Sequence, residues 1–262
     1  RVYEDATSIS THLLPATQAY HEIWLDQEKV ADVKEEIEPI YGATYLPRKF
    51  KIAVAVPPHN DVDVNGNDLS FVAIVKDGEL AGYDVLVGGG MGCSHSTPGT
   101  YPQIAKNLVL ITPDQICPIA EAVVTTQRDN GNRTDRKQAR LKYTVDRMGV
   151  DLFKAEVEKR SGITFAPEEP YTFTMHSDRF GWTENANGTS NLTLFIEHGR
   201  ITDKPDGPQM LQGLLQIADL HGGAFRMTAT QNLVIAEVET KKKEAIEALA
   251  REHGLLRDVS RL

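Results

Sequence analysis

The sequence has only two cysteines, Cys93 and Cys117, and no apolar run long enough for a signal peptide or a membrane span. These absences exclude a disulfide framework and are typical of a soluble, cytoplasmic protein. Cys-x-x-Cys, His-Glu-x-x-His, nucleophile-elbow and P-loop motifs are absent as well. Their absence argues against structural zinc, a hydrolytic triad and P-loop chemistry, and we expect no metal ligated by these residues.

Basic residues are also in deficit, with 28 Lys and Arg against 37 Asp and Glu, a formal net charge of −9. This acidic balance argues against a nucleic-acid partner and against binding to an anionic membrane surface. Any cluster of cations in such a chain is local. The length of 262 residues allows one large domain or two ordinary ones.

The ends of the chain lack ordinary boundary signals. Arg1 lies inside a helical pattern, without an initiator Met or a capping residue, and Leu262 directly follows an amphipathic helix. We therefore predict a piece of a longer polypeptide. The opening helical pattern extends to about Val30 and is followed by an acidic linker at 32–39, which together predict an N-terminal arm over residues 1–44.

Residues 45–166 predict a central α+β domain, a mixed unit of antiparallel sheet and helices. The Asp77-Gly78 pair is a strong hairpin signal between two apolar runs, so we expect three antiparallel strands. Those strands are expected at 51–56, 69–75 and 82–87. Proline and glycine signals then delimit three helices, expected at 113–128, 134–148 and 150–160.

Residues 167–262 predict a second, smaller domain. Its pattern alternates strand and helix, with strands at 192–197 and 225–238 and helices at 209–220 and 241–253. This order indicates a half-ferredoxin-like α/β sandwich module. A sheet this small would gain stability by pairing with a partner half.

Three cations surround an aromatic residue in YLPRKFK, Tyr45 to Lys51, which we call the lysine segment. If the following apolar run is a strand, alternation turns Lys49 and Lys51 to one face and Phe50 to the other. Two converging ammonium groups repel each other unless an anion lies between them. The segment is either an anion site or the solvated start of an edge strand.

The glycine run, Gly88 to Gly92, does not match a dinucleotide fingerprint because the last required glycine is missing. Consecutive glycines either let the backbone approach a flat or bulky ligand, or make a tight turn out of a strand.

The basic stretch, Arg128 to Arg147, concentrates guanidinium and ammonium groups. On a helix from Thr134, four cations would share one face: Arg133, Arg136, Lys137 and Arg140. Such a face is either a solvated helix surface or a binding surface for a ligand with several carboxylates.

A final motif begins at Phe225 and ends with Gln231-Asn232. Arg226, Thr228 and Thr230 would share one strand face, as in an ordinary half-buried strand. The two amides are unusual in a strand interior and suggest a hydrogen-bonding role instead.

Taken together, these strings resemble the sirohaem and iron–sulfur nitrite/sulfite reductase family, specifically its assimilatory sulfite reductases. The matching strings are YLPRKFK, VGGGMG, AEAVVTTQRDNGNRTDRKQARLKYT, FIEHGRI and FRMTATQNLVIA. They occur in the family's order, and the resemblance covers essentially the whole chain. It implies central domains around a sirohaem, clasped by paired half-ferredoxin-like modules.

The resemblance also implies a reaction, the six-electron reduction of sulfite to sulfide on a sirohaem coupled to a four-iron four-sulfur cluster. Lys49 and Lys51 match the lysines that hold sulfite and supply protons, and Arg48 matches an adjoining position beside a haem carboxylate. Further cofactor contacts are expected at Gly89, Gly90, Arg133, Arg136, Gln231 and Asn232. The last two match a second repeat whose own site carries no haem, so a domain-clasping role is expected for them too.

The chain departs from the family pattern in its cysteines. Neither Cys93 nor Cys117 matches the cluster ligands, which are expected after Leu262, so this chain does not ligate the cluster. Electrons are expected from a flavoprotein reductase component or from ferredoxin, and the remaining segments of the same polypeptide are expected partners. Two alternatives stay open: an inactive structural fragment without cofactor, and a parent that is a sirohaem nitrite reductase.

Overall fold

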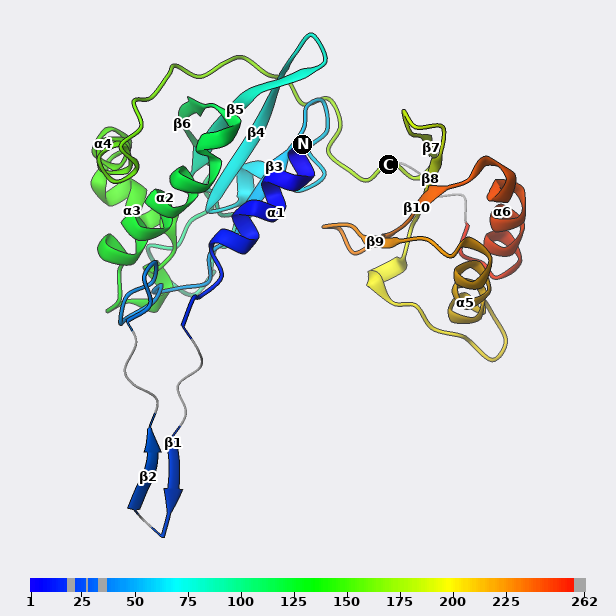
Figure 1. Ribbon diagram of the computed structural model, residues 1–262, viewed down its shortest axis with the longest axis horizontal. Helices are drawn as coiled ribbons and strands as arrows, with labels where there is room; N and C mark the ends of the chain where they lie inside the picture. Colours follow the sequence, from blue (N-terminus) through cyan, green and yellow to red (C-terminus); the bar gives the residue numbers. More distant parts are fainter. Residues whose placement is uncertain (18–21, 27, 33–36, 257–262) are drawn as a thin grey trace. The chain divides into compact units, whose positions relative to one another are not determined.

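The computed structural model describes residues 1–17, 22–26, 28–32 and 37–256. Within it, the chain forms two compact units, Arg1–Thr174 and Met175–Leu262 (Figure 1). Both units combine helices with a four-stranded sheet, which confirms the predicted α+β class. None of the helices in the described residues has both the length and the apolar character of a membrane span.

The first unit is built on a mixed sheet in the order β3-β4-β5-β6. Its strands are β3 (Ile52–Ala55), β4 (Leu69–Lys76), β5 (Glu79–Val87) and β6 (Lys106–Ile111). Strand β3 runs parallel to β4, whereas β5 is antiparallel to both of its neighbours. The predicted all-antiparallel unit was therefore wrong, because residues 56–68, with the short helix η1 (Val64–Gly66), return the chain to the sheet edge where β3 began.

The turn between β4 and β5 was predicted correctly. Asp77 and Gly78 both have positive φ, 52° and 82°, as a two-residue hairpin turn requires. Aspartate tolerates this conformation and glycine adopts it without steric cost, so a local signal was sufficient here.

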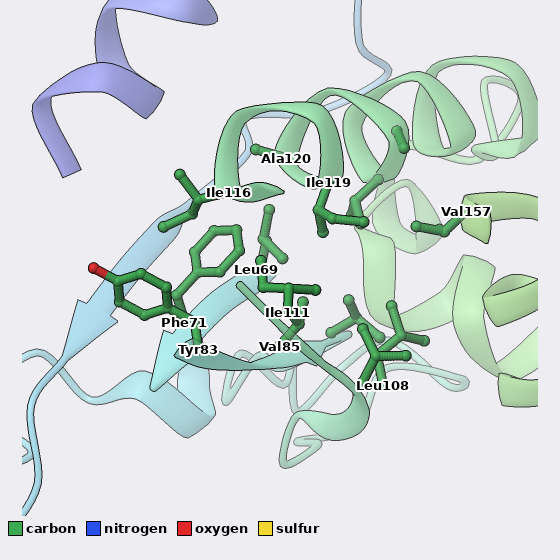
Figure 2. Close-up of a cluster of buried hydrophobic side chains, with 14 of the residues drawn as sticks. Leu69, Phe71, Tyr83, Val85, Leu108, Ile111, Ile116, Ile119, Ala120 and Val157 are labelled. Carbon is green, nitrogen blue, oxygen red and sulfur yellow. The ribbon is translucent and has the colours of Figure 1, made fainter. Parts of the chain in front are cut away.

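Helices cover one face of this sheet. Helix α2 (Ile116–Asn130) follows η2 (Pro113–Gln115), and Thr112 and Gln115 form a reciprocal capping box at its start. Helix α4 (Val150–Ser161) ends at Gly162, whose φ is 67°. Ile116 and Ile119 of α2 and Val157 of α4 share the main core with strand residues such as Phe71, Tyr83 and Leu108 (Figure 2).

The predicted helix at 134–148 is only partly present. The chain forms η3 (Arg136–Gln138), then an extended residue at Arg140 (φ −77°, ψ 157°), and only then α3 (Leu141–Met148). The Asp135 carboxylate accepts a hydrogen bond from the Lys137 N–H and closes the short turn locally. The predicted common face of Arg133, Arg136, Lys137 and Arg140 therefore does not exist.

The opposite face of the sheet carries a smaller core around Val72 and Leu86. Residues 167–174 run across it, where Tyr171 and Phe173 pack. The Thr174 N–H donates to the Pro58 carbonyl at 2.9 Å and fastens this segment to the unit.

The N-terminal region differs from the predicted single helix to Val30. Helix α1 (Val2–His12) is short, and the antiparallel strands β1 (Glu22–Leu25) and β2 (Glu28–Asp32) follow. Pro15 disfavours helix just after α1, which explains the early end. The predicted acidic linker at 32–39 lies partly outside the described residues.

The second unit has an antiparallel sheet in the order β7-β8-β10-β9. Its elements are β7 (Gly181–Glu184), β8 (Ser190–Leu194), η4 (Glu197–Gly199), α5 (Met210–His221), β9 (Phe225–Met227), β10 (Leu233–Val238), η5 (Thr240–Lys242) and α6 (Lys243–Glu252). Ile217 of α5 and Ile246 of α6 share one buried core with the sheet. The predicted strand at 225–238 was wrong as one element, because a turn at 228–232 folds it into a hairpin.

Candidate functional site

The lysine segment lies at the entrance of β3. Lys49 and Lys51 are exposed, whereas Phe50 between them is half-buried against the main core. This matches the alternation expected from the sequence. Within the described residues, neither ammonium group has a hydrogen-bond or ion-pair partner, so both are available to an external anion.

Asp68, directly before β4, joins this segment to two other motifs. Its carboxylate accepts the Lys51 backbone N–H at 3.0 Å and pairs with Arg140, with Nε at 3.1 Å and Nη2 at 2.8 Å. Its backbone carbonyl accepts the Gly88 N–H at 2.8 Å. The lysine segment, the glycine run and the basic stretch therefore meet at one buried residue, Asp68, the first and last through its carboxylate and the glycine run through its backbone carbonyl.

The glycine run needs its glycines for internal reasons. Gly88 has a φ of 78°, and a Cβ on Gly89 would lie 2.4 Å from the Asn65 carbonyl oxygen. A Cβ on Gly90 would come within 3.3 Å of the Lys142 side chain. The tight-turn interpretation accounts for these contacts, and a ligand contact at Gly89 or Gly90 stays a prediction.

The Lys142 side chain binds the backbone of the glycine run. Its buried ammonium donates to the carbonyls of Gly90 at 3.1 Å, Gly92 at 2.9 Å and Tyr101, and lies 4.9 Å from the Tyr143 ring centroid. Burial, followed by the nearby Arg140 charge, lowers the pKa of Lys142. This lysine is a structural cation and is not available to a ligand.

Asp146 fixes the far side of the same loop. It accepts hydrogen bonds from Tyr101 Oη at 2.6 Å, Gln103 Nε2 at 3.0 Å and Lys106 Nζ at 2.6 Å. Burial alone would raise the pKa of Asp146, but these hydrogen bonds outweigh it and the pKa is lowered. The hydrogen bond that Tyr101 donates to Asp146, in turn, raises the pKa of Tyr101 to about 12.

Most cations of the basic stretch are already committed to the protein itself. Arg133 donates to the backbone carbonyls of Thr44 at 3.2 Å and Tyr45 at 2.5 Å, so it braces the start of the lysine segment. Lys137 donates to Thr97 Oγ1 at 3.1 Å. Arg136, by contrast, is exposed and has no side-chain partner within the described residues.

Within the lysine segment and the basic stretch, few cations remain free in the described part of the chain. Arg48, Lys49, Lys51 and Arg136 have no carboxylate partner in the described part of the chain. Three of them are contiguous with the entrance of β3. Unpaired cations gathered in an acidic protein are candidates for binding an anion.

The described residues contain no cluster of three or more His, Cys, Asp or Glu side chains that could hold a metal. Cys93 is exposed and Cys117 is half-buried, and both are free thiols. Burial, with a smaller contribution from Asp5, raises the pKa of Cys117. Because a Cys-ligated iron–sulfur cluster needs four thiolates and the chain has two cysteines, the chain does not supply a full ligand set.

The motif of the second unit has its own buried carboxylate. Asp178 accepts hydrogen bonds from Thr228 Oγ1 at 2.7 Å, from Thr230 Oγ1 and from Asn232 Nδ2 at 2.6 Å. Asn232 Oδ1 also accepts the Ile196 N–H at 2.9 Å, so its amide is fully used within the unit. Gln231 lies at the turn with a φ of 69°. A cofactor contact from either amide stays a prediction.

Sequence reasoning missed Asp68, Lys142 and Asp178. A charged residue directly before an apolar strand, as in Asp68-Leu69, could have indicated a strand-entrance contact. Lys142 lies within a run of buried residues at the start of α3, and only its apolar neighbours hinted at burial. No local signal connects Asp178 to the threonines 50 and 52 positions later.

The chain was compared with known families. The family model described as nitrite and sulphite reductase 4Fe-4S domain matches residues 4–165, and the nitrite/sulfite reductase ferredoxin-like half domain matches residues 184–253. The solved structure of the Mycobacterium tuberculosis NirA protein superposes with a TM-score of 0.67 at 24% identity, covering 82% of this chain and 38% of that one. This likeness supports the fold.

Curated relatives agree with the family match. The chain is 56% identical over 255 residues to the sulfite reductase (NADPH) hemoprotein beta-component of Anoxybacillus flavithermus, covering 97% of this chain and 44% of that protein. The equally named proteins of Erwinia tasmaniensis and Vibrio cholerae are 55% and 56% identical over 258 residues, covering 98% of this chain and 45% and 44% of theirs. The chain thus spans less than half the length of these relatives. Its two family matches, in the order found here, show that it belongs to the nitrite and sulphite reductase family.

Proposed function

We propose that this chain is the sulfite- and sirohaem-binding portion of an assimilatory sulfite reductase that reduces sulfite to sulfide. The observation that carries this proposal is the pair of exposed ammonium groups at Lys49 and Lys51, which have no partner in the described chain. Nearby cations such as Arg133 and Arg140 are committed to internal contacts. The names of the curated relatives support sulfite as the anion.

The residues present fit a sirohaem. Its several carboxylates need cationic donors, and the free guanidinium groups of Arg48 and Arg136 are suited to them. When bound, the sirohaem would supply electrons to the sulfur atom. The second cofactor, a four-iron four-sulfur cluster, cannot be fully ligated by two cysteines. We therefore expect the 262-residue chain to be inactive when separated from the rest of the enzyme.

Lys49 and Lys51 would act on the substrate directly. Their Nζ atoms would hold sulfite oxygens, balance the dianion and donate protons as each oxygen leaves as water. The fixed position of Phe50 in the core favours a constant separation between the two side chains. In this proposal the electron donor is a flavoprotein reductase component or ferredoxin, and the enzyme is cytoplasmic.

The proposal is tested by Lys49→Met and Lys51→Met in the full-length protein that carries this chain. Each variant should lose about 10²-fold or more in sulfite turnover, because one positioned cationic donor is removed, while the sirohaem absorption bands remain. Lys76→Met is a matched control, since Lys76 is an exposed lysine at the opposite end of β4, paired with Glu169 at 2.9 Å. Parent-like turnover in both lysine-segment variants would refute the proposed role.

A further inference from the structure

The backbone of Lys51 is held on both sides by consecutive residues of one strand entrance. Its N–H donates to Asp68 Oδ2 at 3.0 Å, and its carbonyl accepts the Leu69 N–H at 3.1 Å. The Lys51 side chain itself is exposed. The direction in which this side chain leaves the protein is therefore set by Asp68 and Leu69.

Asp68 is a rigid acceptor. Its residue is fully buried, and its carboxylate plane is fixed by two hydrogen bonds from Arg140. Its own carbonyl is tied to Gly88 at the end of β5. A carboxylate held in this way has no alternative rotamer that keeps its contacts. It therefore holds the Lys51 backbone in a fixed position relative to β4 and β5.

The chemistry of this contact requires a carboxylate. Asp68 Oδ2 accepts from two donors at once, the Lys51 N–H and Arg140 Nη2, while Oδ1 accepts Arg140 Nε. If Asp68 were an asparagine, its amide NH2 would replace one of the two accepting oxygens in either side-chain orientation. That NH2 would then face an N–H donor of Lys51 or Arg140, and a hydrogen bond would be lost. Stability alone does not explain the arrangement, because a buried ion pair is commonly replaced by apolar residues without loss.

We infer that Asp68 is a positioning residue that aims the Lys51 ammonium, and through the same segment Lys49, at the bound substrate anion. This inference rests on the proposed function of the two lysines. Asp68 does not contact the anion; it acts through the Lys51 backbone. Arg140 holds Asp68 and contributes to the anion site only through it.

The inference is tested in the full-length protein with three variants. Asp68→Asn disturbs the contact directly, and the double variant Asp68→Ala/Arg140→Met removes the ion pair without leaving a buried unpaired charge. Arg140→Lys keeps a positive charge beside Asp68 and leaves Asp68 as the acceptor for Lys51, but it replaces the two guanidinium hydrogen bonds by a single ammonium donor. Asp129→Asn is the control, because the Asp129 carboxylate accepts from Arg128 and Arg160 and not from the lysine segment.

Three readouts separate positioning from a general structural role: the sirohaem absorption spectrum, the sulfite KM and kcat, and amide hydrogen exchange of the peptide spanning 49–52. We expect Asp68→Asn and the double variant to keep the spectrum, raise KM about 10-fold and accelerate exchange in this peptide while β5 stays protected. Asp129→Asn should resemble the parent in all three, and Arg140→Lys, which keeps the charge but not both hydrogen bonds, should show a smaller effect than Asp68→Asn.

Several results would overturn the inference. These are parent-like exchange in both Asp68 variants, accelerated exchange with an unchanged KM, or an equal loss in Arg140→Lys. If Asp68→Asn does not fold, the double variant decides. Lys49→Met and Lys51→Met, measured in parallel, separate the two proposals: unchanged turnover in both variants refutes the proposed function, whereas lost turnover with parent-like Asp68 variants refutes only the positioning role.

Discussion

Asp84 provides a test of the electrostatics on the sheet face that carries the smaller core around Val72 and Leu86. It lies within β5, is 1% exposed and accepts the Glu169 N–H through both oxygens, at 3.1 and 3.2 Å. The pKa of Asp84 is raised from 3.8 to about 6, mainly by burial. The hydrogen bond from the Glu169 N–H lowers this pKa, and the negative charges of Glu168 and Glu169 raise it further. Among described residues, no cation pairs with Asp84.

The sign of the effect follows from the raised pKa. Between pH 4 and 6 the folded state binds more protons at Asp84 than the unfolded state does, so stability falls as pH rises through this window. The difference between 3.8 and about 6 corresponds to about 3 kcal/mol of destabilisation at neutral pH. The contribution of Asp84 is thus most favourable below its unfolded pKa and is lost above pH 6.

The perturbation is Asp84→Asn, which keeps an oxygen acceptor for the Glu169 N–H and removes the charge. At pH 7.5 we expect the variant to be more stable than the parent by up to about 3 kcal/mol, and at pH 4 we expect this advantage to disappear. The assay is hydrogen exchange of the most protected β4 and β5 amides, which reports the unfolding free energy of this unit at each pH.

Asp129→Asn is a control of opposite sign. The hydrogen bond from Arg128, with a second from Arg160, lowers the pKa of Asp129 to about 2 against its partial burial. Because Asp129 is 40% exposed, we expect a loss of only about 0.5 kcal/mol, present above pH 4 and lost as pH falls towards 2. A pH-independent difference for Asp84→Asn, or the same sign in both variants, would refute this reasoning.

Two further predictions concern the glycine run. Lys142→Met should destabilise the first unit by roughly 2 to 3 kcal/mol, because charge-assisted hydrogen bonds to three carbonyls are lost. The control Lys137→Met, at an exposed lysine, should change the unfolding free energy by less than about 0.5 kcal/mol. Urea unfolding measures both variants, and equal effects would contradict the structural role of Lys142. Gly89→Ala should destabilise the protein by about 3 kcal/mol or more, since the added Cβ would lie 2.4 Å from the Asn65 carbonyl oxygen. The control Gly92→Ala should be near neutral in the same unfolding assay, because the added Cβ would have no atom within 4 Å. A tolerated Gly89→Ala would show that the loop can move aside.

Local signals predicted the local parts of the fold. The Asp77-Gly78 turn and the helical start at Pro113 depend on neighbouring residues alone, so the sequence contains all the information that decides them. The parallel pairing of β3 with β4 could not be read in this way. An apolar run of given length has the same pattern in either direction, and only the connection at 56–68 decides which edge it reaches.

In the candidate site, too, features set by neighbouring residues were predicted, whereas contacts between residues distant in sequence were not. Alternation correctly separated the exposed Lys49 and Lys51 from Phe50, which packs against the core, because it follows from extended-chain geometry. The function of Arg140 could not be inferred, because its partner Asp68 is 72 residues away in sequence. An arginine that binds a ligand and one that pairs internally look identical until the fold brings the acceptor to it.

The Asp77-Gly78 hairpin has a practical consequence that follows from the course of β4. This strand starts beside Asp68 and runs eight residues to Lys76, so the hairpin lies roughly 25 Å from the lysine segment along the sheet. Gly78 has open space around it, with nothing within 4 Å of a built Cβ. A fluorophore or short affinity tag inserted at this tip would label or immobilise the protein while leaving the lysine segment untouched.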